Sequence, residues 1–212
     1  MGASRARGES LSWGSVRIDL VRTGLARRAA SRMDAVVAAY AAVALVLREG
    51  SAGAEVLFIE RAMRAEDPWS GHMAFPGGRL EAGDDSTRTA ACRETQEEVG
   101  LELSRAEYLG HLCDLSGRSG APTPMIVSAH AFHLEQDQPL SLDRNEVRSA
   151  FWFPLAELRS EARRTTHKIP QLPDHDFPAI VVGEPERHFV WGLTYRFLEE
   201  MFELMERPLR ER

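Results

Sequence analysis

The residues with the clearest chemical potential lie between Phe75 and Leu101, in the segment FPGGRLEAGDDSTRTAACRETQEEVGL. Near its end stand Glu94, Glu97 and Glu98. At about 100° per residue, these carboxylates fall within an arc of roughly 100° on a helix. Like charges destabilise a helix by roughly 0.2–0.5 kcal/mol per i,i+4 pair. A divalent cation would stabilise the cluster, because hard cations such as Mg²⁺ prefer oxygen ligands.

A glycine-rich turn at residues 76–78 precedes the acids and would let the backbone approach a ligand closely. Ala90 falls inside the acidic arc, so we expect a bare surface there, with room for a ligand. The alternative is a solvated acidic face, which is common in proteins. We favour a metal site because the acids follow a glycine turn and are not mixed with lysines.

The same segment predicts a helix over residues 86–98. Residues 84–86 (Asp, Asp, Ser) offer N-cap chemistry, and acids suit the positive end of the helix dipole. Gly100 suits the position just after the helix. Small side chains form a separate face suited to packing on a sheet: Ala91, Thr95 and Val99.

Composition narrows the class of protein. The chain has 212 residues, is 43% hydrophobic and carries a net charge of −6, which fits one soluble domain with extensions. A basic nucleic-acid-binding surface is not expected from this charge. The longest apolar stretch, residues 35–47, is too short to span a membrane. Two cysteines, Cys92 and Cys113, read as buried thiols in a reducing compartment. We therefore expect a cytoplasmic protein without nucleic-acid or membrane partners.

Strands outnumber helices, which predicts an α+β layered sandwich. Strands are expected over 36–48, 55–61, 106–115, 125–135, 150–154, 177–182 and 187–191, and a helix over 193–205. We expect the first two strands to form a hairpin, and the last two to form another. We divide the chain into an N-terminal extension (1–33, a short docking helix with a flexible start), a single domain (34–206) and a C-terminal tail (207–212). The basic N-terminal segment and the apolar C-terminal helix (193–205) each pack either on their own core or at a homodimer interface.

The segment that begins at Gly78 resembles the Nudix box, G-x5-E-x7-R-E-U-x-E-E-x-G-U, in which U is aliphatic. Residues 93–101 match its second half, with Thr95 in an aliphatic position. The first half is one residue longer here, and we place Asp85 in the first glutamate position. Residues 71–78, GHMAFPGG, are similar to the G-x3-F-P-G-G of the coenzyme A pyrophosphatase branch of this superfamily.

Two later segments extend the resemblance. Residues 150–155 resemble the strand after the box, and residues 188–194, HFVWGLT, resemble the Trp-Gly-x-Thr of that branch. The similarity covers about residues 34–200. It implies the Nudix fold, an α/β/α sandwich with a mixed central β-sheet. It also implies hydrolysis of a nucleoside diphosphate linked to another moiety, with coenzyme A or its derivatives giving 3′,5′-ADP and 4′-phosphopantetheine.

By position, the resemblance implies a site for Mg²⁺ or Mn²⁺. Its ligands would be Glu94, Glu97, Glu98 and the carbonyl of Gly78, and Arg93 would hold the acids in register. A general base must also take a proton from the attacking water. Glu94 and Glu146 are both candidates for this role, and the sequence does not choose between them.

The candidate substrate contacts are Arg61, Trp69, His72, Phe75, Gly77 and Gly78. One departure bears on the substrate, because Asp67 stands near the place where the branch has a second arginine. An acid there argues against recognition of a 3′-phosphate and favours ADP-ribose or a nucleotide sugar as the alternative substrate. Trp69 either stacks on a nucleobase or covers the core. A non-catalytic nucleotide-binding module is the third alternative, and the presence of all the box acids argues against it.

Overall fold

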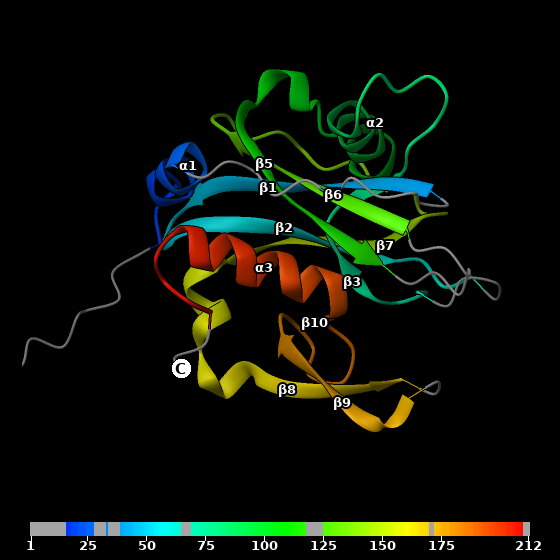
Figure 1. The fold of residues 1–212 in the computed structure, drawn as a ribbon, viewed down its shortest axis with the longest axis vertical. Helices are drawn as coiled ribbons and strands as arrows, with labels where there is room; N and C mark the ends of the chain where they lie inside the picture. The colour runs from blue at the N-terminus through cyan, green and yellow to red at the C-terminus, as the bar shows by residue number, and fades with distance from the viewer. Residues whose placement is uncertain are drawn as a thin grey trace, which may run out of the picture.

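A mixed β-sheet forms the centre of the protein (Figure 1). The computed structural model describes residues 16–27, 33, 39–64, 69–117, 125–169 and 172–209. Within these residues the sheet has seven strands, in the order β3-β2-β1-β6-β5, with β4 beside β1 and β7 beside β2. Strands β1 and β6 are parallel, and the other pairs are antiparallel.

The strands of this sheet are β1 (Ala39–Gly50), β2 (Gly53–Arg61), β3 (Met73–Ala74), β4 (Gly77–Arg79), β5 (Glu107–Gly117), β6 (Met125–Leu134) and β7 (Val147–Pro154). The predicted hairpin of the first two strands is confirmed, with Leu47 opposite Val56. The first residues of the strand predicted over 36–48 lie outside the described residues.

Helices cover both faces of the sheet, which gives the predicted α/β/α sandwich (Figure 1). Helix α2 (Thr87–Val99) lies on one face, and α1 (Ile18–Arg27) and α3 (Gly192–Leu204) lie on the other. Side chains alternate along a strand. Ala44 of β1 therefore packs on the α2 side, whereas Leu45 packs on the α1/α3 side.

The terminal segments belong to the same core. Helix α1 lies in the segment where we expect a short docking helix, and its Ile18 and Val21 are buried in the cluster that includes α3. Leu209, which we placed in the C-terminal tail, is also buried in this cluster, and its carbonyl accepts a hydrogen bond from Arg164. Within the part of the chain that the structure describes, no helix combines the length and apolarity that crossing a membrane requires.

A second, antiparallel sheet lies beside α3 on the face opposite α2 (Figure 1). In the described chain it consists of β8 (Arg164–Ile169), β9 (Leu172–Val181) and β10 (Phe189–Trp191). The β9–β10 hairpin was predicted, but β8 was not. The sequence of β8, RTTHKI, lacks an apolar run because its side chains are half-buried or exposed. Three short 3-10 turns complete the described structure: Leu103–Arg105, Leu155–Arg159 and Glu161–Arg163.

Candidate active site

Helix α2 positions the acidic residues, and its ends follow from the sequence. Ser86 is the N-cap, and its hydroxyl accepts a hydrogen bond from the Thr89 N–H at 3.1 Å. Gly100 ends the helix with a positive φ of 75°, and its N–H donates to the Gln96 carbonyl. The predicted helix is therefore confirmed to within one residue at each end.

The three acids of the box lie at different depths. The side chain of Glu97 is 58% exposed and that of Glu94 is 13% exposed, whereas Glu98 is 2% exposed. Burial raises the pKa of Glu94, against the opposing effect of Arg93. Burial also raises the pKa of Glu98 to about 8. The cluster thus runs from solvent into the interior, rather than lying on one solvated face.

The glycine turn brings the backbone close to these acids. The Gly77 N–H donates a hydrogen bond to Glu98 Oε2 at 2.9 Å. A Cβ at Gly78 would overlap the Glu94 carboxyl group, with Oε2 at 2.6 Å. We expected these glycines to approach a ligand, and the structure shows that they first approach the acids. The Gly77 N–H is already used by Glu98 and does not project toward a substrate.

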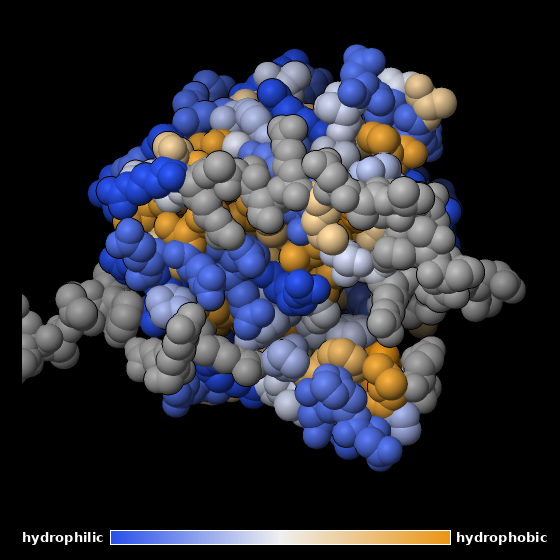
Figure 2. All heavy atoms as spheres, viewed as in Figure 1, coloured by the Kyte–Doolittle hydropathy of each residue, from blue (hydrophilic) through white to orange (hydrophobic). Residues whose placement is uncertain are grey.

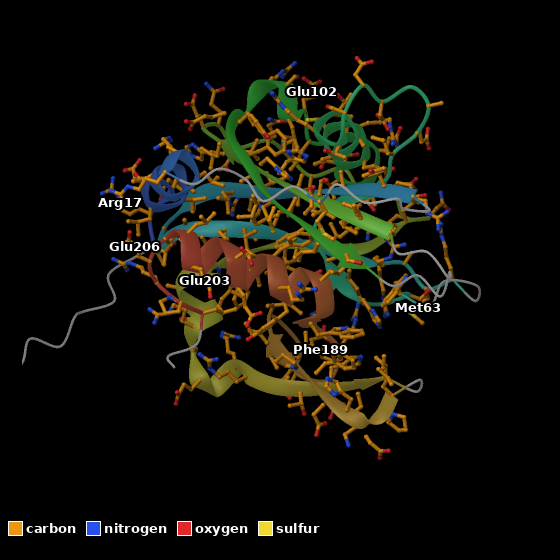
Figure 3. The ribbon with its side chains drawn as sticks, viewed as in Figure 1. Arg17, Met63, Glu102, Phe189, Glu203 and Glu206 are labelled. Carbon is orange, nitrogen blue, oxygen red and sulfur yellow. The ribbon has the colours of Figure 1, made fainter. Side chains whose placement is uncertain are left out.

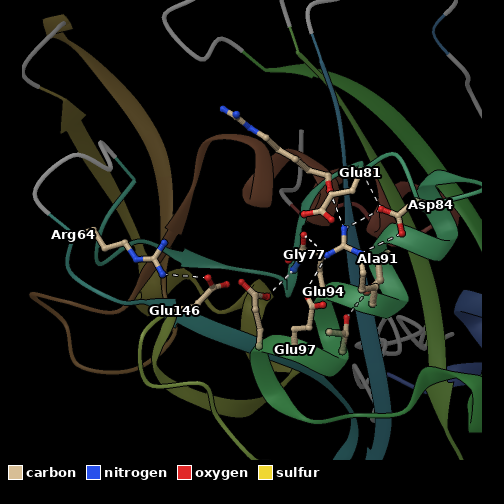
Figure 4. A network of polar contacts seen from close by, with 12 residues as sticks. Arg64, Gly77, Glu81, Asp84, Ala91, Glu94, Glu97 and Glu146 are labelled. Atoms are coloured by element: carbon tan, nitrogen blue, oxygen red, sulfur yellow. Dashed lines mark hydrogen bonds and ion pairs between the residues drawn. The ribbon is translucent and has the colours of Figure 1, made fainter.

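Arg93 joins the acids to the loop before the helix (Figure 4). One terminal nitrogen of its guanidinium lies 3.0 Å from a carboxylate oxygen of Glu94 and 3.0 Å from one of Glu97. The other terminal nitrogen donates to Asp84 at 2.9 Å and to the Arg79 carbonyl at 3.1 Å. Arg93 therefore contacts two of the box acids, Glu94 and Glu97.

The acid that pairs with Arg93 is Asp84, not Asp85. The side chain of Asp84 is 3% exposed, and the hydrogen bond from Arg93 lowers its pKa, whereas Asp85 is exposed. The sequence contained the signal, because five residues separate Gly78 from Asp84, as the box requires. The extra residue of this chain lies after the first acid rather than before it.

Two further expectations about α2 need comment. Ala90 is fully buried and packs in the core on this face of the sheet, so the bare surface that we expected there is absent. Thr95 occupies its aliphatic position without an unpaired hydroxyl, because Oγ1 donates to the Ala91 carbonyl at 2.7 Å. Of the two thiols expected to be buried, Cys113 is buried and Cys92 is intermediate.

Glu146 lies at the edge of the acid cluster and is held there by an arginine. Its loop is bonded to the end of α2, because the Asp143 N–H donates to the Glu98 carbonyl at 3.0 Å and the Glu146 N–H donates to the Asp143 carbonyl at 3.0 Å. Arg64 donates to Glu146 Oε1 at 3.1 Å and to the Asn145 carbonyl at 3.0 Å (Figure 4). Sequence reasoning did not single out Arg64, whose only signal was its position three residues after β2.

Some of the candidate substrate contacts lie in the core, and others lie near the acids or at the surface. Phe75 is 2% exposed and stacks on Phe58 at 5.4 Å between ring centroids, so it is a core residue rather than a surface for substrate. Arg61 lies close enough to Glu98 to oppose the rise in its pKa. Trp69 is 43% exposed, and its ring centroid lies 5.9 Å from that of His72. Asp67 lies outside the described residues.

The donor chemistry of this site fits a divalent cation. In the described part of the chain, no three His, Cys, Asp or Glu side chains are already arranged around a common metal position. Arg93 instead supplies the positive charge between Glu94 and Glu97. The carboxylates are oxygen donors of the kind that Mg²⁺ and Mn²⁺ use. Gly78 leaves the space that the Glu94 carboxyl group occupies. A cation would add to the positive charge of Arg93, which balances only part of the negative charge of these acids.

Comparisons with known proteins identify the family to which the chain belongs. Residues 38–174 match the NUDIX domain family. An uncharacterized protein of Schizosaccharomyces pombe, C14C4.10c, is 41% identical over 107 residues, which cover 49% of this chain and 32% of that protein. The uncharacterized Nudix hydrolase NudL of Escherichia coli is 30% identical over 132 residues, which cover 62% of this chain and 66% of NudL. The chain thus spans about a third of the first relative and just under two thirds of the second.

Two solved structures match part of the chain at low sequence identity. The Ap4A hydrolase of C. elegans is 22% identical with a TM-score of 0.47, and the similarity covers 55% of this chain and 80% of that one. The NUDIX domain of Shewanella oneidensis NrtR, solved with ADP ribose, is 19% identical with a TM-score of 0.46, over 59% of this chain and 77% of that one. The family match extends over more than half of the sequence. The chain therefore belongs to the NUDIX domain family and has the Nudix fold.

Proposed function

We propose that this protein is a metal-dependent hydrolase of the pyrophosphate bond in a nucleoside diphosphate linked to another moiety. The observation that carries the proposal is the acid cluster of α2, fixed between the glycine turn and Arg93 in a member of the NUDIX domain family. The relative NudL, which is named a Nudix hydrolase, supports hydrolysis as the reaction.

We assign the binding of Mg²⁺ or Mn²⁺ to Glu94, Glu97 and Glu98, together with the Gly78 carbonyl. Such a cation, when bound, neutralises phosphate charge and lowers the pKa of a coordinated water. Arg93 has a positioning role, because it sets the distance between Glu94 and Glu97 and anchors both to Asp84. Glu98 is positioned by the Gly77 N–H.

We assign the general base to Glu146 rather than to Glu94. A base must reach the attacking water and accept its proton. Glu94 is largely buried and is needed as a ligand. The side chain of Glu146 is 42% exposed at the edge of the cluster, and its backbone carbonyl accepts the Ala62 N–H at 2.7 Å, which fixes its loop to the end of β2.

We propose coenzyme A or one of its derivatives as the substrate, on the basis of the motifs at residues 71–78 and 188–194. ADP-ribose or a nucleotide sugar is the alternative, which Asp67 favours. Asp67 favours the alternative because an arginine that would bind the 3′-phosphate is missing there. Arg61 and Arg64 weaken this argument, because both supply positive charge beside the acids.

The context of the activity is also part of the proposal. We place the catalytic domain at residues 34–206, with residues 1–33 and 207–212 as its extensions. The free thiols of Cys92 and Cys113 fit a reducing compartment, so we place the protein in the cytoplasm. A homodimer stays a prediction, which light scattering of the purified chain would test.

Product identification by mass spectrometry tests the proposed function. The substrates would be coenzyme A, an acyl-coenzyme A, ADP-ribose, a nucleotide sugar and a nucleoside triphosphate, each with Mg²⁺, with Mn²⁺ and with a chelator. We expect 3′,5′-ADP and 4′-phosphopantetheine from coenzyme A only when the cation is present. Release of AMP from ADP-ribose, with coenzyme A left intact, would support the same hydrolysis reaction but would assign ADP-ribose as the substrate. Tight nucleotide binding without any product would favour the non-catalytic module.

A further inference from the structure

Beside the acid cluster, aromatic rings from the two sheets meet in one group. Trp69 and His72 come from the segment before β3, His167 from β8 and Trp191 from β10. We call these four rings the aromatic surface. The centroid of His72 lies 5.1 Å from that of Trp191 and 5.8 Å from that of His167. His167 and Trp191 are 4.4 Å apart, and Trp69 and Trp191 are 6.4 Å apart.

The aromatic surface adjoins the site that handles phosphate in the proposed function. The Arg61 N–H donates to the His72 carbonyl at 3.1 Å, and the Gly71 N–H donates to the Arg61 carbonyl at 3.1 Å. The next residue, Ala62, donates its N–H to the carbonyl of Glu146, the proposed base, at 2.7 Å. His72 precedes Gly77, the partner of Glu98, by five positions. One short segment therefore joins the aromatic rings to the carboxylates.

A buried ion pair fixes the second sheet against the main sheet. The side chain of Glu60, on β2, is 1% exposed. Its carboxylate accepts hydrogen bonds from two nitrogens of Arg187, at 2.7 and 2.6 Å, and from the Ser149 hydroxyl at 2.7 Å. Arg187 lies just before β10, the strand that carries Trp191. The rings are thus held in place before a ligand arrives, which reduces the ordering that binding requires.

The group is open to solvent on one side. Trp69 is 43% exposed, and the large apolar side chains near it include Met63 at 68%. Figure 2 shows apolar side chains beside this group on the second sheet, where Figure 3 labels Phe189 of β10, whose ring centroid lies 4.8 Å from that of His167. Burial lowers the pKa of His167. An uncharged imidazole can stack and can also donate or accept a hydrogen bond.

We propose that the aromatic surface binds the nucleobase of the substrate, so that the second sheet supplies base recognition and α2 supplies the phosphate chemistry. This inference rests on the proposed function for the identity of the substrate. A nucleobase is a planar heteroaromatic ring, and bases stack on aromatic side chains without strict sequence preference. Indole and imidazole rings that meet edge to face at the site border are suited to such a ligand.

The test compares ligands that differ only in the base. Calorimetry would measure the binding of AMP, UMP and ribose 5-phosphate in the presence of Mg²⁺, without turnover. The variants are Trp69→Ala, Trp69→Phe and His167→Ala. Trp152→Ala is the matched control, because this half-buried tryptophan of β7 lies under the Arg48 guanidinium on the α2 side of the sheet.

We expect Trp69→Ala and His167→Ala to weaken AMP binding by about tenfold, the loss of one stacking contact, and to leave ribose 5-phosphate unchanged. Trp69→Phe retains a ring and should recover most of the affinity. Equal weakening of AMP and ribose 5-phosphate, or no weakening of either, would overturn the inference. So would an effect of the same size in Trp152→Ala.

The same variants separate this inference from the proposed function. If the substrate panel gives no product with any cation, the proposed hydrolysis fails, but the calorimetric comparison still decides the base site. If hydrolysis occurs, KM for the cleaved substrate should rise in Trp69→Ala with kcat nearly unchanged. A rise in KM without weaker AMP binding would assign the aromatic surface to the other half of the substrate and would overturn the inference.

Discussion

The carboxyl group of Glu94 occupies the space that a Cβ at residue 78 would fill. Gly78 is therefore required by a side chain from α2 rather than by its own backbone conformation. Gly77 differs, because it has a positive φ of 153° and a Cβ there would lie 2.7 Å from the Val43 Cα. A side chain of the site thus excludes a Cβ at Gly78, whereas the backbone of β1 excludes one at Gly77.

Gly78→Ala should reduce activity more than stability. The atoms that an added Cβ would meet belong to the flexible end of Glu94, which can move away but then leaves its position beside Arg93. Loss of a correctly oriented ligand typically costs about 10- to 100-fold in metal affinity or activity. Steady-state kinetics and urea unfolding would measure the two effects.

Gly77→Ala is the control for that substitution. Its Cβ would meet backbone atoms of β1 in a conformation that L side chains rarely adopt, so we expect a loss of about 1–3 kcal/mol in the free energy of unfolding. Equal stability losses in the two variants would contradict this distinction.

Asp84→Asn should weaken the support of Arg93. The carboxylate of Asp84 is nearly inaccessible and accepts two hydrogen bonds from Arg93, at 3.2 and 2.9 Å. Hydrogen bonds to charged groups contribute about 1.5–3 kcal/mol, so we expect a loss of this order in urea unfolding, together with lower kcat. The pKa of Asp84 is lowered in the folded state, so its stabilisation is present above the ordinary value of 3.8 and lost as the pH falls below it.

Asp85→Asn provides the matched control, because this neighbouring acid is exposed. It should change the free energy of unfolding by less than about 0.5 kcal/mol. If Asp85→Asn lowers activity as much as Asp84→Asn does, the assignment of the Arg93 partner is wrong.

The stability of the metal-free protein should fall as the pH rises toward 8. Folded Glu98 keeps its proton up to a pH of about 8, whereas the unfolded chain releases it near 4.5. Between these values the folded state binds more protons, so each pH unit costs at most about 1.4 kcal/mol. Thermal unfolding of the wild type and of Glu98→Gln at about pH 6 and about pH 8 isolates this contribution.

Binding of a divalent cation should favour the ionised form of Glu98, whereas folding without a cation favours its protonated form. Cations bind the ionised carboxylate, so binding releases a proton and becomes stronger as the pH rises. The increase in melting temperature caused by Mg²⁺ should therefore be larger at the higher pH. A shift that is the same at both values, or one that survives in Glu98→Gln, would count against Glu98 as a ligand.

Arg187→Ala should destabilise the contact between the two sheets. Burial opposes ionisation of Glu60, but hydrogen bonds from Arg187 and Ser149 hold the pKa of this carboxyl below its ordinary value. Removing one partner of a buried pair leaves an uncompensated charge and typically costs about 3–5 kcal/mol. Arg187 is 32% exposed and Arg148 lies 3.6 Å away, so we expect the lower end of this range.

Lys168→Ala is the control for the Glu60–Arg187 ion pair between the two sheets. Lys168 pairs with Asp176 on the same small sheet, but both side chains are more than half exposed. Exposed pairs contribute about 0–1 kcal/mol, so urea unfolding should barely change. If Arg187→Ala were equally neutral, the Glu60 ion pair would not hold the sheets together.

The sequence alone was sufficient where local signals agree with the fold. Helix α2 has a serine cap, a terminal glycine and a small apolar face, and it forms within one residue of the predicted span. The two apolar segments of β1 and β2, with a short turn between them, likewise specified their hairpin. Local patterns, however, do not show which residues distant in sequence come together.

The errors have physical causes of that kind. Ala90 lies inside the acidic arc by helix geometry, but tertiary packing buries it. Strand β8 lacks an apolar run because its side chains stay partly exposed, and its pairing with β9 provides its order. The contact of His167 with Trp191 and the pair of Glu60 with Arg187 depend on how the second sheet meets the first, and no spacing along the chain encodes that.

The central claim is that the α2 acids support hydrolysis by binding a divalent cation. Its most direct test is the rate of product formation as a function of Mg²⁺ concentration, for the wild type, Glu97→Gln, Glu98→Gln and the control Glu102→Gln. Glu102 pairs with Arg105 outside the cluster and is labelled in Figure 3. We predict that the two box variants lose about 10- to 100-fold or more in rate while remaining folded, and that the control does not. Undiminished turnover in both box variants, or product formed in the presence of a chelator, would contradict the account.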